Sequence, residues 1–411
     1  MFLSKLELTN FRNIKNLRLG LPNSPVIFYG QNAQGKTNIL ESIYLLSSIK
    51  SFRADKDSQL VRVGQNFARV WGKVDSSEVE IVVSLLKGNL LSPGWMTNAS
   101  LEQITPDEHN HAPGGNFPTK KEIKVNKTKK KALEALGEIK AVLFSPEDIN
   151  ILTGPPADRR RFLDVLISAV DRKYLFTLAA YQKAIKSRNR VLWWLKEGRK
   201  ENLEIWDEQV VSLGAAIWLR RREVVEQLNG LLGPISQGIQ EACLQIKYQP
   251  GLAEVSKDKT ITEALLKAHF LKELSRHQEG DIRRTTTSTG PHRDDFSVVS
   301  KRLEVASTES NLEEEILSDV AVYGSRGEQR AAILALKLAE LAFEEKESGQ
   351  KPILLLDDVL SEFDESHRQH LLSLVSKQQT LITATSLDMI SQNVLDKAKV
   401  FQVKEGIIKE D

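Results

Sequence analysis

Apolar and polar residues alternate over the first twenty positions of the chain, with Leu8 and Phe11 on the apolar side. A two-residue period predicts strands that bury one face. Residues 25–29 form a short apolar run typical of a buried strand, whereas residues 38–46 repeat apolar side chains at helical spacing. Strand-like alternation resumes over residues 69–86. The first third of the chain is therefore predicted to be mixed α/β.

The middle of the chain changes to helical periodicity, which predicts a helical lobe over residues 151–284. Apolar residues recur every three or four positions in four stretches, at 161–167, 174–197, 205–232 and 261–274. Four tryptophans lie in these stretches, and we expect them to pack between helices rather than serve as stacking platforms. They are Trp193, Trp194, Trp206 and Trp218.

The end of the chain returns to an alternation of helices and strands. Residues 331–345 and 365–375 have helical patterns, and residues 353–356 and 381–385 read as strands. Residues 1–150 and 285–411 are thus predicted to form one discontinuous α/β lobe, into which the helical lobe is inserted.

Residues 88–120 interrupt this pattern with prolines, glycines and asparagines, and we expect an exposed insertion loop. His109 and His111 lie within it, but no further Cys or His is near enough to complete a metal site. Solvated side chains are therefore favoured over metal ligands at both positions.

Composition narrows the class of protein. The chain has 411 residues and a formal net charge of +2, and no stretch is long and apolar enough to cross a bilayer. Lys5 and Glu7 interrupt any apolar core of a signal peptide. Cys243 is the only cysteine, which excludes an internal disulfide framework. These features favour a soluble, cytoplasmic protein.

Basic residues gather in four clusters although the net charge is small. The clusters are residues 127–131, 159–161, 183–190 and 220–222. A single cluster is equally well explained as a solvated helix face, but four together favour a surface for the phosphate backbone of DNA. Candidate contacts in them are Lys129, Lys130, Arg188 and Arg190.

A glycine-rich segment between the buried strand and the first helix predicts a phosphate-binding P-loop. Its residues are Gly30, Gln31, Asn32, Ala33, Gln34, Gly35, Lys36 and Thr37. The glycines allow the backbone N–H groups to point inward, and the following helix adds the positive end of its dipole. We expect Lys36 to reach the β- and γ-phosphates and Thr37 to bind Mg²⁺.

Four apolar residues at 353–356 followed by Asp357 and Asp358 predict a buried strand that presents two acids at its C-terminal end, the Walker B arrangement. Ligands of parallel sheets bind at that edge, so Asp357 can reach the metal beside Thr37. Asp358 would then lie near the γ-phosphate as a general base or water-orienting group.

Ser325 and Gly327 precede the helix at 331–345 and form a second candidate anion site. Alone, they would read as a helix cap. Their place just before the Walker B strand matches the signature motif of ABC-type ATPases, in which the serine and glycine close on a γ-phosphate held by the other protomer.

Taken in order, these motifs resemble the RecF family of the SMC-like ABC ATPases. The residues that carry the resemblance run through nearly the whole chain and comprise residues 8–13, 30–38, 50–53, 144–148, 156–164, 289–295, 325–330 and 355–364.

This resemblance implies an ABC ATPase head with a helical second lobe, with ATP and Mg²⁺ as cofactors. It also implies slow, DNA-stimulated hydrolysis within an ATP-sandwiched homodimer. It adds further residues to the nucleotide side of the site, namely Arg12, Asn38, Gln329 and Thr385. ABC transporters usually have Glu where this chain has Asp358, and His where it has Thr385, so the catalytic set is weaker and suits a switch.

The resemblance further implies action on double-stranded and gapped DNA, with mediators of the RecO and RecR type and a RecA-type recombinase as partners. Arg53 is similar to head-domain arginines close to nucleotide or DNA. Two other classes share part of the pattern, namely the ATPase subunit of an ABC transporter and a P-loop kinase. His292 and Arg293 could form a base cluster with the following aspartates, but a structural ion-pair network is favoured.

Overall fold

A computed structural model describes residues 1–86, 118–240, 242–257, 260–305, 313–375 and 377–411. Most of the predicted insertion, including His109 and His111, lies outside these residues. The described chain divides into two compact units. Unit 1 comprises residues 1–145, 352–364 and 371–411, and unit 2 comprises residues 146–351 and 365–370.

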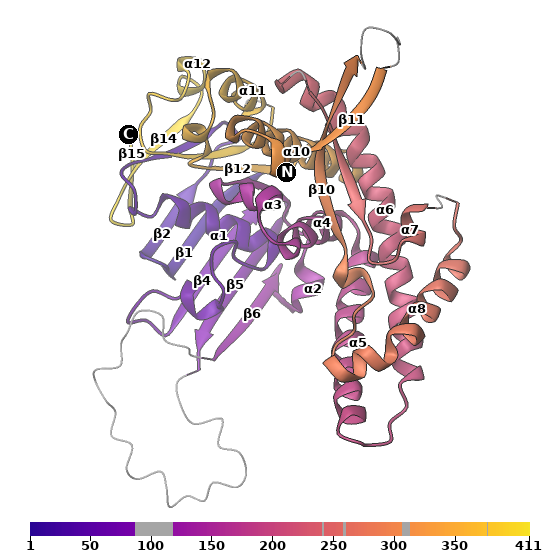
Figure 1. Cartoon of the computed structure of the whole chain (residues 1–411). Coiled ribbons are helices and arrows are strands. Elements are labelled where there is room, and N and C mark those ends of the chain that lie inside the picture. Colours follow the sequence, from indigo (N-terminus) through magenta and orange to yellow (C-terminus); the bar gives the residue numbers. More distant parts are fainter. Residues whose placement is uncertain (87–117, 241, 258–259, 306–312, 376) are drawn as a thin grey trace, which may run out of the picture. The chain divides into compact units, whose positions relative to one another are not determined.

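Unit 1 contains an antiparallel six-stranded sheet in the order β2-β1-β4-β5-β6-β7 (Figure 1). Alternating burial along β1 and β4 explains the two-residue period of the sequence, because one face of the sheet is covered by the core. The strands are β1 (Leu3–Phe11), β2 (Ile14–Gly20), β4 (Phe67–Val74), β5 (Ser77–Leu85), β6 (Thr119–Val125) and β7 (Thr128–Lys130).

The second sheet of unit 1 has the order β15-β14-β3-β13-β12-β8, and only the pairing of β14 with β15 is antiparallel. Strand β13 lies between β3 and β12, so the carboxyl ends of these three strands meet at one edge. The bounds are β3 (Val26–Tyr29), β8 (Ala141–Phe144), β12 (Ile353–Asp357), β13 (Thr380–Ala384), β14 (Lys399–Lys404) and β15 (Ile407–Glu410).

Helix α1 (Lys36–Ser48) contacts strands of both sheets. Its side chains Ile39, Leu40, Ile43 and Leu46 are fully buried in one hydrophobic core with residues of both sheets. A helix buried on this much of its surface has a fixed position, so the P-loop that precedes it is anchored at its C-terminal end. Shorter helices of unit 1 are η1 (Asp57–Leu60), α2 (Ala132–Ala135), η5 (Val359–Glu362) and α12 (Gln392–Leu395).

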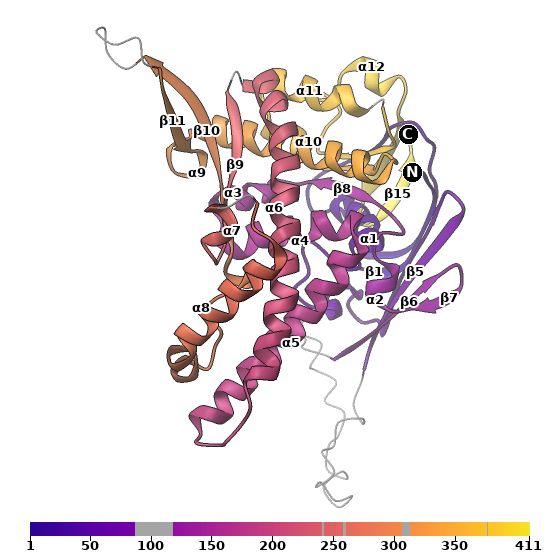
Figure 2. The ribbon, with the colours of Figure 1, turned by 90° about the vertical axis from the view of Figure 1, so that its right-hand side faces the viewer.

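Unit 2 is mainly helical, with a small antiparallel sheet in the order β11-β10-β9 (Figure 2). Its long helices are α4 (Pro156–Val170), α5 (Arg172–Lys196), α6 (Glu204–Gln240), α8 (Glu263–Arg284) and α10 (Arg326–Ser348). Its strands are β9 (Cys243–Gln249), β10 (Asp295–Val305) and β11 (Glu313–Asp319). The short helices are η3 (Pro146–Ile149), α3 (Asn150–Thr153), α7 (Glu254–Lys257), η4 (Pro291–Arg293) and α9 (Val320–Tyr323). Helix α11 (Glu365–Val375) has residues in both units.

The tryptophans of unit 2 are not all packing residues. Trp218 is fully buried and its ring lies 4.6 Å from that of Phe270 between centroids. Trp194 and Trp206 pack against a small cluster at the end of the α5–α6 pair. Trp193, in contrast, is 46% exposed, so the expectation that all four pack between helices is wrong at this position.

The two units differ from the predicted lobes, because residues 285–351 and 365–370 group with the helices rather than with the P-loop sheet. Strand β10 pairs with β9, with Asp295 opposite Gln249, and α10 packs against α6. Both contacts join residues far apart in the sequence, which a local pattern does not reveal. In the part of the chain that the structure describes, no helix combines the length and apolarity needed to span a bilayer.

Candidate nucleotide-binding site

The P-loop connects β3 to α1, and its backbone requires glycine at two positions. Gly30 and Gly35 have φ angles of 151° and 109°. A Cβ atom at Gly30 would lie 2.4 Å from the carbonyl oxygen of Val403, and one at Gly35 would lie 2.7 Å from Oδ1 of Asn13. Ala33 also has a positive φ of 64°. The loop is thus held in a conformation that other residues would strain.

The ammonium of Lys36 lies inside this loop. Its Nζ donates to the carbonyl oxygens of Gly30 at 2.7 Å and Gln31 at 3.0 Å, and the residue is buried. Burial lowers the pKa of Lys36, whereas the charges of Asp358 and Asp357 act in the opposite direction. A buried cation surrounded by the loop is suited to a polyphosphate.

Thr37 and Asp357 meet, as predicted from the Walker A and Walker B patterns. The Thr37 hydroxyl donates to Oδ1 of Asp357 at 2.9 Å. A threonine hydroxyl and a carboxylate are oxygen ligands of the kind that Mg²⁺ takes together with phosphate and water. The residues present therefore fit a magnesium ion at this position.

Thr383 of β13 forms hydrogen bonds with both acidic residues at the end of β12, and the sequence does not predict this role. Its hydroxyl donates to Oδ1 of Asp357 at 2.8 Å and accepts the backbone N–H of Asp358 at 2.9 Å. The position follows from the strand order, because β13 lies directly beside β12 with Thr383 opposite Asp357. The family resemblance points instead to Thr385, which is exposed just beyond the end of β13. Its role at the nucleotide stays a prediction.

Asp358 has a strained backbone. Its φ of 56° is in the left-handed region, which costs a residue with a Cβ on the order of 1 kcal/mol or more. The Ser361 hydroxyl donates to the Asp358 carbonyl at 2.8 Å and so fixes the turn. Asp358 is only partly buried. Burial lowers the pKa of Lys36, and the negative charge of Asp358 is the larger of the two charges that raise it. Its carboxylate therefore lies within electrostatic reach of the P-loop.

Hydrogen bonds from two neighbouring turns hold the P-loop at Gln34. Asn13 donates from Nδ2 to the Gln34 carbonyl at 3.1 Å, and Asn38 donates to Oδ1 of Asn13 at 2.8 Å. The backbone N–H of Gly406 donates to the same Gln34 carbonyl at 2.9 Å, and that of Glu405 donates to the Gln34 side chain at 2.7 Å. The turns after β1 and β14 thus position the loop.

Arg12 forms an ion pair inside unit 1. Its Nε and Nη2 donate to the two carboxylate oxygens of Glu41 at 2.9 and 2.6 Å, and Glu41 is fully buried in α1. Ser51 donates to Glu41 at 2.5 Å and accepts the backbone N–H of Arg53 at 2.9 Å. The exposed guanidinium of Arg53 comes within 3.5 Å of Oδ1 of Asn38. Contacts of Arg12 and Arg53 with nucleotide or DNA stay predictions.

The signature residues belong to unit 2, whereas the P-loop belongs to unit 1. Ser325 is the N-cap of α10 and forms a capping box with Glu328, and Gly327 is exposed in the first turn. Gln329 donates from Nε2 to the carbonyl oxygens of Val320 at 3.3 Å and Ala321 at 3.1 Å. The cap that the sequence allowed is present, and it leaves the start of the helix open to solvent.

Among the predicted DNA contacts, Arg188 is a correction. It is fully buried, and it donates to Asp207 at 2.6 Å and to Asp281 and Thr287 at 2.9 Å. A guanidinium enclosed in this way is a structural ion pair and cannot contact a phosphate backbone in this structure. The helical period could have predicted this burial. Arg188 lies four residues after the buried Ala184, so both side chains are on the same face of the helix.

The other predicted DNA contacts are exposed. Lys129 and Lys130 lie on β7, where Lys129 pairs with Glu122 at 3.2 Å. Arg190 is exposed on α5, and its guanidinium lies 5.5 Å from the centroid of the Trp194 ring. These three side chains are accessible to a partner.

The aspartates after His292 form ion pairs with Arg159 and Arg221, which is the arrangement that the sequence favours. Asp294 is buried and accepts hydrogen bonds from Arg221, Tyr248 and Trp218. His292 contacts the Tyr181 hydroxyl through Nδ1 at 2.7 Å, and burial lowers its pKa to about 4. His292 and Asp294 thus take part in a buried network of hydrogen bonds and ion pairs.

Comparison with known proteins extends over the whole chain. The sequence pattern of the RecF/RecN/SMC N-terminal domain family matches residues 2–409. DNA replication and repair protein RecF of Roseiflexus castenholzii is 34% identical over 418 residues, with 99% of both chains covered. The same-named protein of Alkaliphilus oremlandii is 34% identical over 413 residues, covering 99% of this chain and 100% of the relative. The solved recombination mediator protein RecF-ATP in the RecFOR pathway has a TM-score of 0.82 at 31% identity, over 100% of this chain and 97% of that one.

Proposed function

This chain belongs to the RecF family of SMC-like ABC ATPases, a family of DNA replication and repair proteins, and we propose that it is an ATP-gated recombination mediator. Its fold is accordingly that of an ABC-type ATPase head with a helical lobe. A transporter subunit, the alternative that the motifs left open, is not favoured by these relatives.

The hydrogen bond between Thr37 and Asp357 carries the proposal for the nucleotide site. It joins the first residue after the P-loop lysine to the end of the Walker B strand, at the sheet edge where ligands of parallel sheets bind. The P-loop N–H groups and Lys36 would hold the phosphates of ATP. Thr37 and Asp357 would hold Mg²⁺, which when bound neutralises charge on the phosphates.

Asp358 would orient the attacking water or accept its proton. The Thr383 hydroxyl fixes the backbone of Asp358 and the carboxylate of Asp357 at the same time. An aspartate reaches less far than the glutamate usual in ABC transporters, so turnover would be slow. Slow turnover suits a protein in which ATP controls assembly rather than drives continuous work.

Assembly would bring a second copy to the site. Ser325 and Gly327 at the exposed start of α10 would close on the γ-phosphate held by the other protomer, with backbone N–H groups and the helix dipole as the attraction. Lys36 of one copy and Ser325 of the other would then contact one nucleotide. ATP would stabilise the dimer, and hydrolysis would release it.

The substrate of this switch would be double-stranded DNA near single-strand gaps. Lys129, Lys130 and Arg53 are exposed cations of unit 1 that would contact phosphates. Mediators of the RecO and RecR type and a RecA-type recombinase would act with the closed dimer, in the cytoplasm.

The experiment that tests the proposal measures binding of gapped duplex DNA at several salt concentrations, with and without ATP, together with oligomeric state by light scattering. We expect tight DNA binding and dimers only with ATP, and neither with the Lys36→Ala variant. ATP-driven dimers that ignore DNA would leave the ABC assignment in place and contradict the mediator role.

A further inference from the structure

Two apolar residues shortly before Ser325 are strongly exposed. Tyr323 is 78% exposed, the highest value among the exposed large hydrophobic side chains of the described residues, and Val322 is 69% exposed. Both lie in the short helix α9, whose first residue, Val320, is buried. Single exposed apolar residues are common on protein surfaces, but two adjacent ones beside a candidate ligand site indicate an interaction surface. We call Val322 and Tyr323 the α9 patch.

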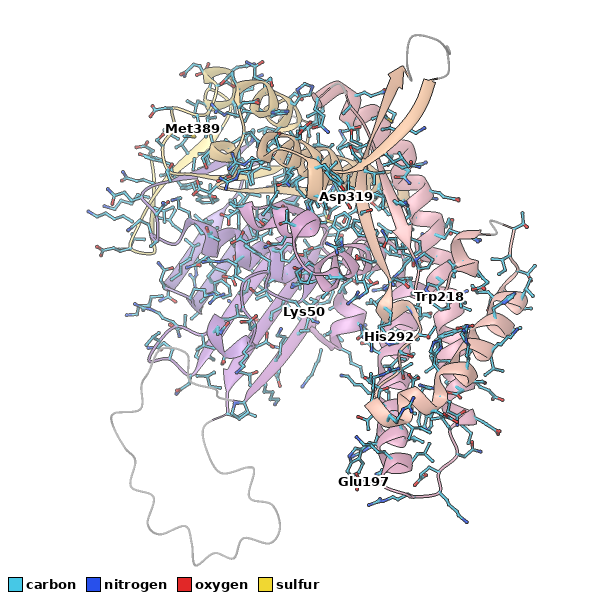
Figure 3. All side chains as sticks on the ribbon, in the orientation of Figure 1. Lys50, Glu197, Trp218, His292, Asp319 and Met389 are labelled. Carbon is cyan, nitrogen blue, oxygen red and sulfur yellow. The ribbon has the colours of Figure 1, made fainter. Side chains whose placement is uncertain are left out.

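The backbone of the α9 patch is held in a fixed position beside the start of α10. Asp319, which Figure 3 labels, is the N-cap of α9, and its carboxylate accepts the N–H of Ala321 at 2.8 Å. The Gln329 side chain of α10 donates to the carbonyl oxygens of Val320 at 3.3 Å and Ala321 at 3.1 Å. A Cβ atom at Gly324 would lie 2.5 Å from the carbonyl oxygen of Val320, so the link between the two helices is tightly packed. A patch on such a support loses little backbone freedom when a partner binds.

The surface next to the α9 patch is positive. Arg326 is exposed in the first turn of α10, where a cation opposes the helix dipole and so does not stabilise the helix. The acidic residue of that turn, Glu328, forms the capping box with Ser325. The exposed start of α10 therefore combines apolar side chains with positive charge, and it fits a partner surface that is partly apolar and anionic.

We propose that the α9 patch packs on the nucleotide-binding face of a second copy of this chain when that copy holds ATP. The inference rests on the proposed function, and it adds to the closed dimer an apolar contact outside Ser325 and Gly327. ATP brings its phosphate charges to a site that already contains Asp357 and Asp358, so the bound site attracts the positive start of α10. Apolar side chains at the rim exclude water, which strengthens the contact of Ser325 with the γ-phosphate.

A second copy explains the patch better than duplex DNA does. Both partners are anionic, and both would attract Arg326. The backbone of a duplex, however, offers phosphates and few apolar groups, so it does not account for an exposed valine and tyrosine side by side. Aromatic side chains in a water-excluded contact are typical of interfaces between proteins.

The test measures ATP-driven dimerisation of the full-length Val322→Ser/Tyr323→Ser variant by light scattering over a range of protein concentrations. We expect the dimer to be about a hundredfold weaker than in the wild type, because a symmetric dimer contains the patch twice and each loss should cost about tenfold. The matched control Phe176→Ser/Leu265→Ser removes two exposed apolar side chains from α5 and α8, and it should dimerise as the wild type does.

Binding of ATP to the monomer separates a contact with the second copy from damage to the fold. A fluorescent ATP analogue, at protein concentrations too low for dimers, should bind equally well to the wild type and to Val322→Ser/Tyr323→Ser. Far-UV circular dichroism and urea denaturation should also be unchanged, because both side chains are exposed. Loss of monomer binding would contradict a contact made with the other copy.

Mixing two defective proteins tests the same point directly. Neither Lys36→Met nor Val322→Ser/Tyr323→Ser should dimerise well with ATP on its own. A mixed dimer has one complete site, formed by the P-loop of the serine variant and the α9 patch of Lys36→Met. We expect energy transfer between two labels, one on each protein, to show ATP-driven mixed dimers, and no recovery in the mixture would overturn the proposal.

The outcomes distinguish this inference from the proposed switch. If the wild type does not dimerise with ATP, the proposed function and the inference both fail. If the wild type and Val322→Ser/Tyr323→Ser dimerise equally well, the α9 patch alone is overturned. Normal dimerisation of the serine variant together with weaker binding of duplex DNA would assign the patch to DNA instead.

Discussion

Thr383 donates its hydroxyl hydrogen to Asp357 at 2.8 Å and accepts the backbone N–H of Asp358, so one side chain of β13 holds both acids of the Walker B strand. Asp357 also accepts a hydrogen bond from Thr37, so the two residues that we propose to hold the metal are oriented from a neighbouring strand. Groups that orient metal ligands commonly affect metal affinity or activity by about tenfold to a hundredfold.

We therefore expect Thr383→Val to lower the rate of ATP hydrolysis by about tenfold or more. Valine keeps the shape of threonine but leaves the N–H of Asp358 without its acceptor, so unfolding free energy should also fall by about 1 to 3 kcal/mol. Steady-state ATPase assays and urea denaturation measure the two effects. Thr383→Ser is the control that keeps the hydroxyl, and wild-type turnover in the valine variant would show that Thr383 is not needed.

Lys36→Met should abolish ATP-driven dimerisation. The Nζ atom that contacts the Gly30 and Gln31 carbonyls is the cation we assign to the phosphates, and methionine fills similar space without charge. Light scattering with and without ATP measures the result. Dimers that form normally with ATP would remove Lys36 from the nucleotide site.

Asp358→Asn should separate binding from hydrolysis. The amide has nearly the shape of the carboxylate but cannot act as a base, so ATP should bind and dimers persist while turnover falls roughly a hundredfold or more. Asparagine also tolerates the positive φ of 56° at this position, which limits the structural effect. A single-turnover assay with matched dimer measurements would detect the split. Unchanged turnover in Asp358→Asn would mean that another residue orients or deprotonates the attacking water.

The site was predictable where its chemistry is local in sequence. The P-loop and the Walker B acids are short segments that can be recognised from their residue types alone. The expected proximity of Thr37 and Asp357 is seen as a hydrogen bond between their side chains. Thr383 was not predictable, because its role depends on β13 lying between β3 and β12. Nothing in residues 381–385 alone reveals that strand order.

Charge clusters were a weaker guide than motifs. The basic run at 183–190 contains both exposed cations and the fully buried Arg188, whose partners Asp207 and Asp281 come from α6 and α8. Composition does not distinguish exposed cations from a buried one. They can be told apart only by the face of the helix on which each residue lies. The grouping of residues 285–351 with unit 2 likewise depends on the pairing of β9 with β10.

Arg12→Ala should destabilise unit 1 by about 3 kcal/mol or more, because it leaves the fully buried carboxylate of Glu41 without its cation. Adding Glu41→Gln removes the buried charge and should recover much of the loss. Urea denaturation of the single and double variants measures this coupling. If the double variant is even less stable than Arg12→Ala, the predicted coupling between Arg12 and Glu41 is contradicted.

The same variants test the second role that family resemblance implies for Arg12. If Arg12 also contacts the nucleotide, the double variant should regain stability without regaining ATP affinity. Isothermal titration with a non-hydrolysable ATP analogue separates the two roles, and full recovery of affinity would confine Arg12 to the ion pair with Glu41.

His292 gives the protein a specific pH dependence. Burial lowers its folded-state pKa to about 4, below the usual 6.5, so the unfolded chain binds more protons between these values. Stability is therefore fully present above about pH 6.5 and falls as the pH decreases toward 4, by about 3 kcal/mol in total. His292→Gln should flatten this part of the profile of unfolding free energy. Equal slopes in the wild type and His292→Gln would mean that another group is responsible for the acid loss of stability.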